Sequence, residues 1–192
     1  MLKPYAGRTH EDMKPVLMNP EGEGPEIYYY MIRGGTEKRN ITVWETGTVG
    51  NEYIKTFGHY HVGKLAETYW IVQGEGIVLL QARKVDTNGL PIDDEIDFFQ
   101  AIKVKAGDHV FIPQNTGHLA VNIGKTWFVT VDDSPVNFEE QDPVSLPGHA
   151  DYKSIKKLHG FAYYVIKENN LPKLVKNPNY KNVPGATIQN AS

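Results

Sequence analysis

The sequence predicts an all-β protein, built as an antiparallel barrel or sandwich. Short segments rich in β-branched and aromatic residues recur about every ten residues, a spacing typical of such folds. Turns that contain Gly or Pro separate these segments. No stretch between them is suited to a crossover helix, which argues against a parallel sheet of βαβ units.

The composition limits the class of protein. A chain of 192 residues suits one domain with appendages. Its net charge of −3 and pI of about 6.2 predict no nucleic-acid partner and no membrane partner. The sequence has no cysteine, which excludes disulfides, thiolate nucleophiles and Cys-ligated metals. No signal-peptide pattern and no membrane-spanning apolar stretch is present, so we expect a cytoplasmic protein.

Residues 1–26 are predicted to form an N-terminal arm, because four prolines interrupt them. One helical turn is expected at residues 9–14, before Pro15. The first strands of the barrel are predicted at residues 27–32 and 40–46, where aromatic and β-branched side chains dominate.

The middle of the chain supplies most of the predicted strands. Residues 67–73 and 77–83 are expected to pair as a hairpin across Gly74 and Gly76. A polar turn is predicted at residues 86–94, which contain the hairpin signal Asn88-Gly89. The remaining strands are predicted at residues 95–105, 109–112, 119–123 and 126–132.

The C-terminal part changes character. We predict a loop at residues 134–148, a short helix at 151–158 that ends near Gly160, and a strand at 161–167. The polar segment from Asn177 onward is expected to be mobile. The predicted organisation is therefore an arm (1–26), a β domain (27–176) and a C-terminal tail (177–192).

Three histidines and one carboxylate are candidates for a metal site. His59 and His61 are two residues apart, so on an extended segment their side chains share one face. Glu67 opens the next predicted strand, and His118 follows another strand that begins after a Gly107-Asp108 turn. Imidazole and carboxylate ligands suit Fe²⁺, Mn²⁺, Ni²⁺ or Zn²⁺. The alternative is a surface histidine pair with His118 in an unrelated turn.

The spacing of these residues resembles the cupin family. Gly58-His59-x-His61, Glu67 and Gly74 match the first cupin motif, and Gly107, Pro113, Gly117-His118 and Asn122 match the second. Five residues separate His61 from Glu67, slightly more than in most cupins. The resemblance implies a double-stranded β-helix, or jelly-roll barrel, with the N-terminal arm and the short C-terminal helix as additions.

Longer patterns narrow the resemblance to the cupin-type glucose-6-phosphate isomerases of archaea and some bacteria. These patterns are Thr56-x-Gly58-His59-x-His61, Ala66-Glu67-x-Tyr69, Pro113-x4-His118-x3-Asn122-Ile123-Gly124, Gly148-His149-x-Asp151-Tyr152 and Asn177-Pro178. The resemblance implies a homodimeric enzyme of glycolysis and gluconeogenesis. It would interconvert glucose 6-phosphate and fructose 6-phosphate with one divalent metal per chain, for which Fe²⁺ is the first choice.

The same resemblance implies a role for each residue at a matching position. The metal ligands would be His59, His61, Glu67 and His118. A catalytic role would fall to Glu67 and also to Tyr69, which shares a strand face with Glu67; the alternative for Tyr69 is a core side chain. Substrate contacts would come from Thr42, Thr56, Gly58, His149 and Tyr152, of which the first three correspond to the phosphate site. The sequence departs from the family at Asp133, which aligns with a tyrosine near the end of the strand after the second motif.

Two routes of isomerisation are compatible with these residues. In one, a base removes the C2 proton to give a cis-enediol, and Glu67 is the only carboxylate in the motifs that is suited to this role. In the other, a hydride moves between C1 and C2. Outside this family, a metal-dependent dioxygenase and a non-catalytic sugar-binding cupin are the alternatives. Within it, mannose 6-phosphate or another sugar phosphate is an alternative substrate.

Overall fold

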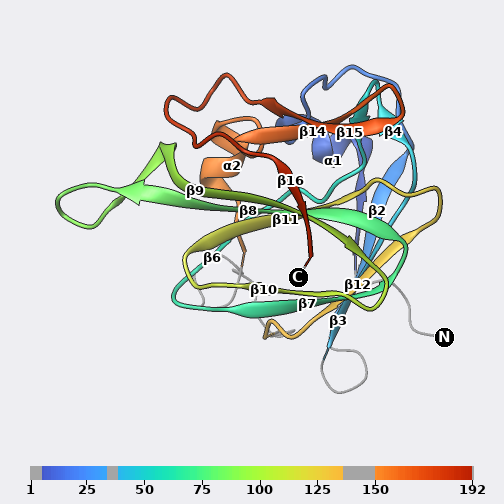
Figure 1. The fold of residues 1–192 in the computed structure, drawn as a ribbon, viewed down its shortest axis with the longest axis horizontal. Coiled ribbons are helices and arrows are strands. Elements are labelled where there is room, and N and C mark those ends of the chain that lie inside the picture. Colours follow the sequence, from blue (N-terminus) through green and yellow to red (C-terminus); the bar gives the residue numbers. More distant parts are fainter. Residues whose placement is uncertain (1–5, 34–38, 136–149, 192) are drawn as a thin grey trace.

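The computed structural model describes residues 6–33, 39–135 and 150–191 (Figure 1). Strands dominate these ranges, and the two short α-helices and one 3-10 helix lie near the ends of the chain. In chain order the elements are β1 (Ala6–Thr9), α1 (His10–Met13), η1 (Lys14–Val16), β2 (Ile27–Ile32), β3 (Asn40–Trp44), β4 (Thr48–Val49), β5 (Glu52–Tyr53), β6 (Tyr60–His61), β7 (Glu67–Gln73), β8 (Glu75–Val85), β9 (Pro91–Lys105), β10 (His109–Ile112), β11 (Thr116–Asn122), β12 (Phe128–Asp132), β13 (Ala150–Asp151), α2 (Lys153–Lys157), β14 (Tyr163–Glu168), β15 (Leu171–Lys176) and β16 (Ile188–Asn190).

Two sheets form the walls of the barrel, as the all-β prediction requires (Figure 1). One has the strand order β1-β2-β3-β12-β7-β10, and the other has the order β11-β8-β9-β16. Alternate side chains of each strand face the interior. Three of them, Tyr29, Trp44 and Phe128, pack together, with ring centroids 6.3 Å apart for Tyr29–Trp44 and 5.1 Å apart for Trp44–Phe128. These rings are part of the hydrophobic core of the barrel.

Most predicted strands are confirmed, and most differences concern lengths. The predicted hairpin of residues 67–73 with 77–83 is wrong, because β7 pairs with β10 and β12 whereas β8 pairs with β9 and β11 in the other sheet. Strands β2, β7 and β10 have the predicted bounds, whereas β8 and β9 extend further toward each other. Their turn is short because the Asp86 carboxylate accepts hydrogen bonds from the N–H groups of Asn88 and Leu90, at 2.8 and 2.9 Å. Strand β15 was not predicted; it pairs with β14. Helix α2 lies within the predicted helix.

The prediction of a mobile C-terminal tail is wrong. The Asn177 side chain is fully buried and donates hydrogen bonds to the carbonyls of Leu158 and Phe161, both at 2.9 Å. Tyr180 is buried as well, and β16 pairs in parallel with β9. A polar composition suggested mobility, but these polar groups have partners that are distant in sequence.

The N-terminal arm also contacts the barrel, through a strand and a buried ion pair. Strand β1 pairs with β2 at the edge of the six-stranded sheet. The Lys55 ammonium group, which is 3% exposed, donates to the carboxylate of Glu52 and to the carbonyl of Val16. Glu52 in turn accepts a hydrogen bond from the N–H of Met18 at 2.8 Å. The division of the chain at residues 26 and 176 stays a prediction. No helix in the described ranges is long and apolar enough to cross a membrane.

Candidate metal centre

The three candidate histidines lie together inside the barrel. His59 and His118 exchange backbone hydrogen bonds as an antiparallel bridge, with N···O distances of 3.2 and 3.0 Å. Their side chains therefore lie side by side, with ring centroids 4.3 Å apart. His61 follows two residues after His59 and adds a third ring on the same face. One ring nitrogen from each histidine lies within 4.8 Å of the other two, a spacing suited to one metal ion.

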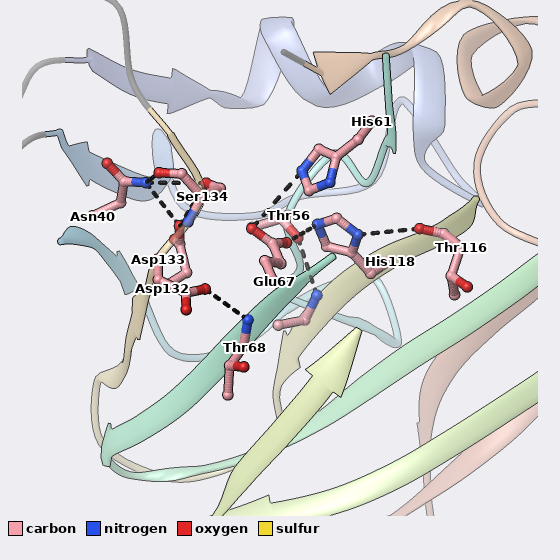
Figure 2. A network of polar contacts seen from close by, with 11 residues as sticks. Asn40, Thr56, His61, Glu67, Thr68, Thr116, His118, Asp132, Asp133 and Ser134 are labelled. Atoms are coloured by element: carbon pink, nitrogen blue, oxygen red, sulfur yellow. Dashed lines mark hydrogen bonds and ion pairs between the residues drawn. The ribbon is translucent and has the colours of Figure 1, made fainter. Parts of the chain in front are cut away.

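Glu67 completes this group from the start of β7 (Figure 2). Its Oε1 lies 2.7 Å from Nε2 of His118, and its Oε2 lies 3.8 Å from Nε2 of His61. The Oε1 and Nε2 atoms of the close pair are both buried and have no other partner among the described residues. A buried carboxylate and imidazole that share one positive charge are suited to a proton or a cation, so these residues fit a metal ion.

The opposite nitrogen of the His118 ring helps to orient it. Nδ1 of His118 lies 3.5 Å from the carbonyl oxygen of Thr116, an acceptor position that assigns the proton to Nδ1. His61 likewise interacts with the backbone of Leu65. With protons on the outer nitrogens, the inner nitrogens carry the lone pairs that a metal needs.

The electrostatics of the site favour neutral His59 and His61. Burial and the neighbouring His118 lower the pKa of His61 to about 4, and burial with the other two histidines lowers the pKa of His59 well below its usual value. Burial alone would raise the pKa of Glu67, but His118 and His61 hold it below its usual value. Burial also acts to lower the pKa of His118, but the Glu67 carboxylate outweighs it and raises that pKa. A positive charge is therefore favoured between Glu67 and His118, as a proton or a metal ion.

Of the residues predicted to bind phosphate, Thr56 and Gly58 lie just before His59 in the chain, and Thr42 lies on β3. Thr42 is buried on the inner side of β3. The Thr56 hydroxyl accepts a hydrogen bond from the N–H of Ala120 at 3.1 Å, which leaves its own hydrogen available to a ligand. Gly58 has a φ of +78°, and a Cβ at this position would lie 2.6 Å from Cε1 of Phe161. Only glycine suits both restrictions.

Two of the predicted tyrosines also lie beside the histidines. Tyr69 is buried on β7 and contacts His118 edge to face, with ring centroids 5.5 Å apart. Burial and the nearby Glu67 raise the pKa of Tyr69 well above its usual value, so its phenol is a hydrogen-bond donor at neutral pH. Tyr152 has its ring centroid 5.6 Å from that of His59. His149 lies outside the described residues.

Asp133, the residue at which the sequence departs from the family, has a side chain that faces away from the site. Its carboxylate accepts a hydrogen bond from the N–H of Thr68 at 2.8 Å and lies 3.4 Å from the Arg39 guanidinium, and it is 40% exposed. The preceding residue, Asp132, faces the interior instead and accepts a hydrogen bond from Asn40 at 2.7 Å. Strand alternation from Phe128 would have indicated this orientation. Burial and the Glu67 charge raise the pKa of Asp132.

Two arginines near the site were not predicted from the sequence. Arg33 follows β2, and its charge acts on the titration of His59, Tyr69 and Asp132. Arg8 lies on β1, with its guanidinium 5.9 Å from the centre of the Tyr152 ring. Nη1 of Arg33 and Nε of Arg8 are buried and make no hydrogen bond within the described ranges. No sequence motif marks either residue, because both enter the site through strand pairing.

An all-β barrel with three histidines and a glutamate gathered in its interior defines a protein of the cupin class. The family model described as glucose-6-phosphate isomerase (GPI) matches residues 26–182. The glucose-6-phosphate isomerase of Thermococcus onnurineus (strain NA1) is 33% identical over 186 residues, which cover 91% of this chain and 86% of the relative. That of Pyrococcus horikoshii is 30% identical over 188 residues, or 91% of this chain and 87% of the relative. The chain belongs to the glucose-6-phosphate isomerase family.

Solved structures are similar over a smaller part of the chain. A recombinant oxalate oxidase in complex with glycolate gives a TM-score of 0.37 at 20% identity, over 49% of this chain and 39% of that chain. Oxalate decarboxylase from Bacillus subtilis at pH 4.6 gives 0.36 at 18% identity, over 58% of this chain and 25% of that chain. These likenesses are too distant to indicate a reaction.

Proposed function

We propose that this protein interconverts glucose 6-phosphate and fructose 6-phosphate with one bound divalent metal ion. The observation that carries the proposal is the convergence of His59, His61, Glu67 and His118 within a chain of this family. The curated relatives that match over about 90% of the chain are named for this reaction. We further propose Fe²⁺ as the first choice of metal, a homodimer as the assembly and the cytoplasm as the location.

The metal ion would be held by the three histidines and Glu67, and it would supply Lewis-acid stabilisation of negative charge on the substrate oxygens. Tyr69 would donate a hydrogen bond to a sugar oxygen from its position beside His118. The hydroxyls of Thr42 and Thr56 and the backbone at Gly58 would bind the phosphate. Tyr152 would contact the substrate near His59. His149, which lies outside the described residues, would be a further substrate contact.

Glu67 is proposed as the group that moves the proton. In the enediol route its carboxylate takes the proton from C2 of the open-chain aldose and returns it to C1, while a proton passes from O2 to O1. The low pKa of Glu67 keeps it ionised and able to accept this proton at neutral pH. In a hydride shift the hydrogen would pass directly between C1 and C2, and Glu67 would only hold the metal.

The first experiment measures activity and metal dependence together. EDTA-stripped protein is reconstituted with Fe²⁺, Mn²⁺, Ni²⁺ or Zn²⁺ and assayed by coupling fructose 6-phosphate to glucose 6-phosphate formation, with mannose 6-phosphate as a second substrate. We expect isomerisation of fructose 6-phosphate with at least one metal and none without metal. Absence of turnover with every metal would refute the proposed reaction.

The second experiment separates the base from the ligand. Glu67→Gln is expected to lower kcat by about 10²- to 10⁴-fold, the contribution typical of general base catalysis. Bound metal is quantified in the same samples. Glu75→Gln is the matched control, because Glu75 is an exposed glutamate at the start of β8. A Glu67→Gln protein that keeps both its metal and near-wild-type kcat would exclude the base role.

A further inference from the structure

The phosphate site described above has no positive side chain from the motifs around it. Thr42, Thr56 and Gly58 offer hydroxyls and backbone, and the neighbouring Lys55 is taken up by the buried pair with Glu52. A sugar phosphate brings about 1.5 to 2 negative charges at neutral pH. A binding site inside a barrel needs a cation to offset the cost of desolvating that charge.

Arg8 approaches this site from the N-terminal strand. It lies opposite Tyr29 in the pairing of β1 with β2. The Tyr29 hydroxyl accepts a hydrogen bond from the N–H of Phe57 at 3.3 Å, and Phe57 is the residue between Thr56 and Gly58. The Arg8 guanidinium also lies over Tyr152, whose ring is 5.2 Å from Phe57 and 5.6 Å from His59. Arg8 is thereby located beside the Thr56–Gly58 segment.

Among the described residues, no carboxylate forms an ion pair with Arg8. Arg8 forms no ion pair in the part of the chain that the structure describes, and its Nε is buried without a hydrogen-bond partner. Its interactions are with the rings and hydroxyls of Tyr29 and Tyr152. The charge of Arg8 also acts on Asp12, but Asp12 is exposed and its carboxylate is already bonded to Thr9. A half-buried guanidinium with an unused donor is suited to bind an anion.

The other unpredicted arginine, Arg33, is in a different electrostatic position. Its charge acts on Asp132, which is buried on the inner side of β12. One positive and one negative charge offset each other there. A divalent metal with the Glu67 carboxylate would leave one further positive charge, and Arg8 would supply a second. Two positive charges match a phosphate dianion, so the charge count favours Arg8.

We propose that Arg8 is a substrate-binding residue that pairs with the phosphate group of the sugar phosphate, beside Thr56 and Gly58. This inference rests on the proposed function for the identity of the substrate. It extends the site beyond residues 26–182, which match the family model, because Arg8 lies in the segment before them. The N-terminal strand would then complete the binding site and determine specificity for phosphorylated sugars.

The test uses full-length, metal-reconstituted protein and four variants. Arg8→Gln removes the charge, Arg8→Lys keeps it, and Arg33→Gln removes the other buried cation. Arg39→Gln is the matched control, because Arg39 pairs with Asp133 on the outer side of the sheet. Binding of fructose 6-phosphate and of unphosphorylated fructose is measured by calorimetric titration. KM and kcat are measured in the coupled assay, and bound metal and thermal unfolding are recorded for each variant.

For Arg8→Gln we expect KM for fructose 6-phosphate to rise about 10- to 100-fold, with kcat within about threefold of wild type, since one charge-assisted contact is lost. Fructose binding should not change. Arg8→Lys should recover part of the loss, and Arg39→Gln should equal wild type. If Arg8→Gln does not fold, Arg8→Met replaces it, because its unbranched stem can keep the packing on Tyr152.

Three results would overturn the inference. The first is a KM for Arg8→Gln within twofold of wild type. The second is that Arg33→Gln abolishes the preference for the phosphorylated sugar while Arg8→Gln keeps it. The third is that wild-type protein binds fructose with the same affinity as fructose 6-phosphate. The titration separates the two proposals. Protein that binds fructose 6-phosphate through Arg8 without isomerising it would support this inference and refute the proposed reaction.

Discussion

The buried ion pair between Lys55 and Glu52 gives the sharpest prediction about stability. The two side chains are 3% and 1% exposed. Lys55→Met removes the ammonium group and its hydrogen bond of 2.7 Å to the Val16 carbonyl, and it leaves the Glu52 carboxylate buried without its counter-ion. Loss of one partner from a buried pair costs about 3–5 kcal/mol. We expect the free energy of unfolding to fall by that amount.

The measurement is urea denaturation of metal-free protein at pH 7, with the slope of the transition checked for two-state behaviour. Lys84→Met is the matched control, because Lys84 pairs with Glu95 at 3.0 Å but is 47% exposed, and such pairs contribute less than about 1 kcal/mol. The double variant Lys55→Met/Glu52→Leu should regain most of the loss, since no buried charge is left unpaired. The reasoning is refuted if Lys55→Met costs no more than Lys84→Met, or if the double variant is no more stable than the single one.

Two further predictions concern the site. The pKa of His61 is about 4 in the folded chain against about 6.5 when unfolded, so below pH 6.5 the unfolded state binds one more proton than the folded state. The free energy of unfolding of metal-free protein should therefore fall by up to about 3 kcal/mol as the pH falls from 6.5 to 4. The His61→Gln variant should lose less stability over the same pH range. Equal pH profiles of the two proteins in urea denaturation would contradict this. Gly58→Ala should cost about 2–4 kcal/mol, because its Cβ would meet Phe161 and its φ is +78°. Gly47→Ala is the control, because Gly47 has a φ of +109° but open space around it, and it should cost about 1–2 kcal/mol. Both variants are measured by thermal and urea unfolding. If the two variants lose the same stability, the steric argument for Gly58 is excluded.

The gathering of the candidate metal ligands was predictable because its signals are local, and their role as ligands stays a prediction. His59 and His61 are two residues apart on an extended segment, and Glu67 and His118 occupy fixed positions in their motifs. The structure brings their side chains together as expected. Strand bounds followed from the same kind of information, since alternation and glycine turns are properties of short segments.

Predictions from the sequence failed where contacts between residues far apart in the chain determine the structure. The tail was expected to be mobile, yet Asn177 is buried because it bonds to carbonyls that precede it by 19 and 16 residues. The orientation of Asp133, which was expected to mark a departure from the family, was not predicted. It faces outward after β12, whereas Asp132 faces inward. A shift of one residue reverses the face of a strand, and composition alone does not determine that register.

The sequence by itself determined the all-β class, the order of most strands, the four candidate metal ligands and the family. Those features depend on residue type and short spacing. Only the tertiary structure decided which charged groups accompany the ligands: Asp132 through the face of β12, and Arg8 through the pairing of β1 with β2. Strand pairing joins segments far apart in the chain, and it therefore brings into the site residues that no local pattern identifies.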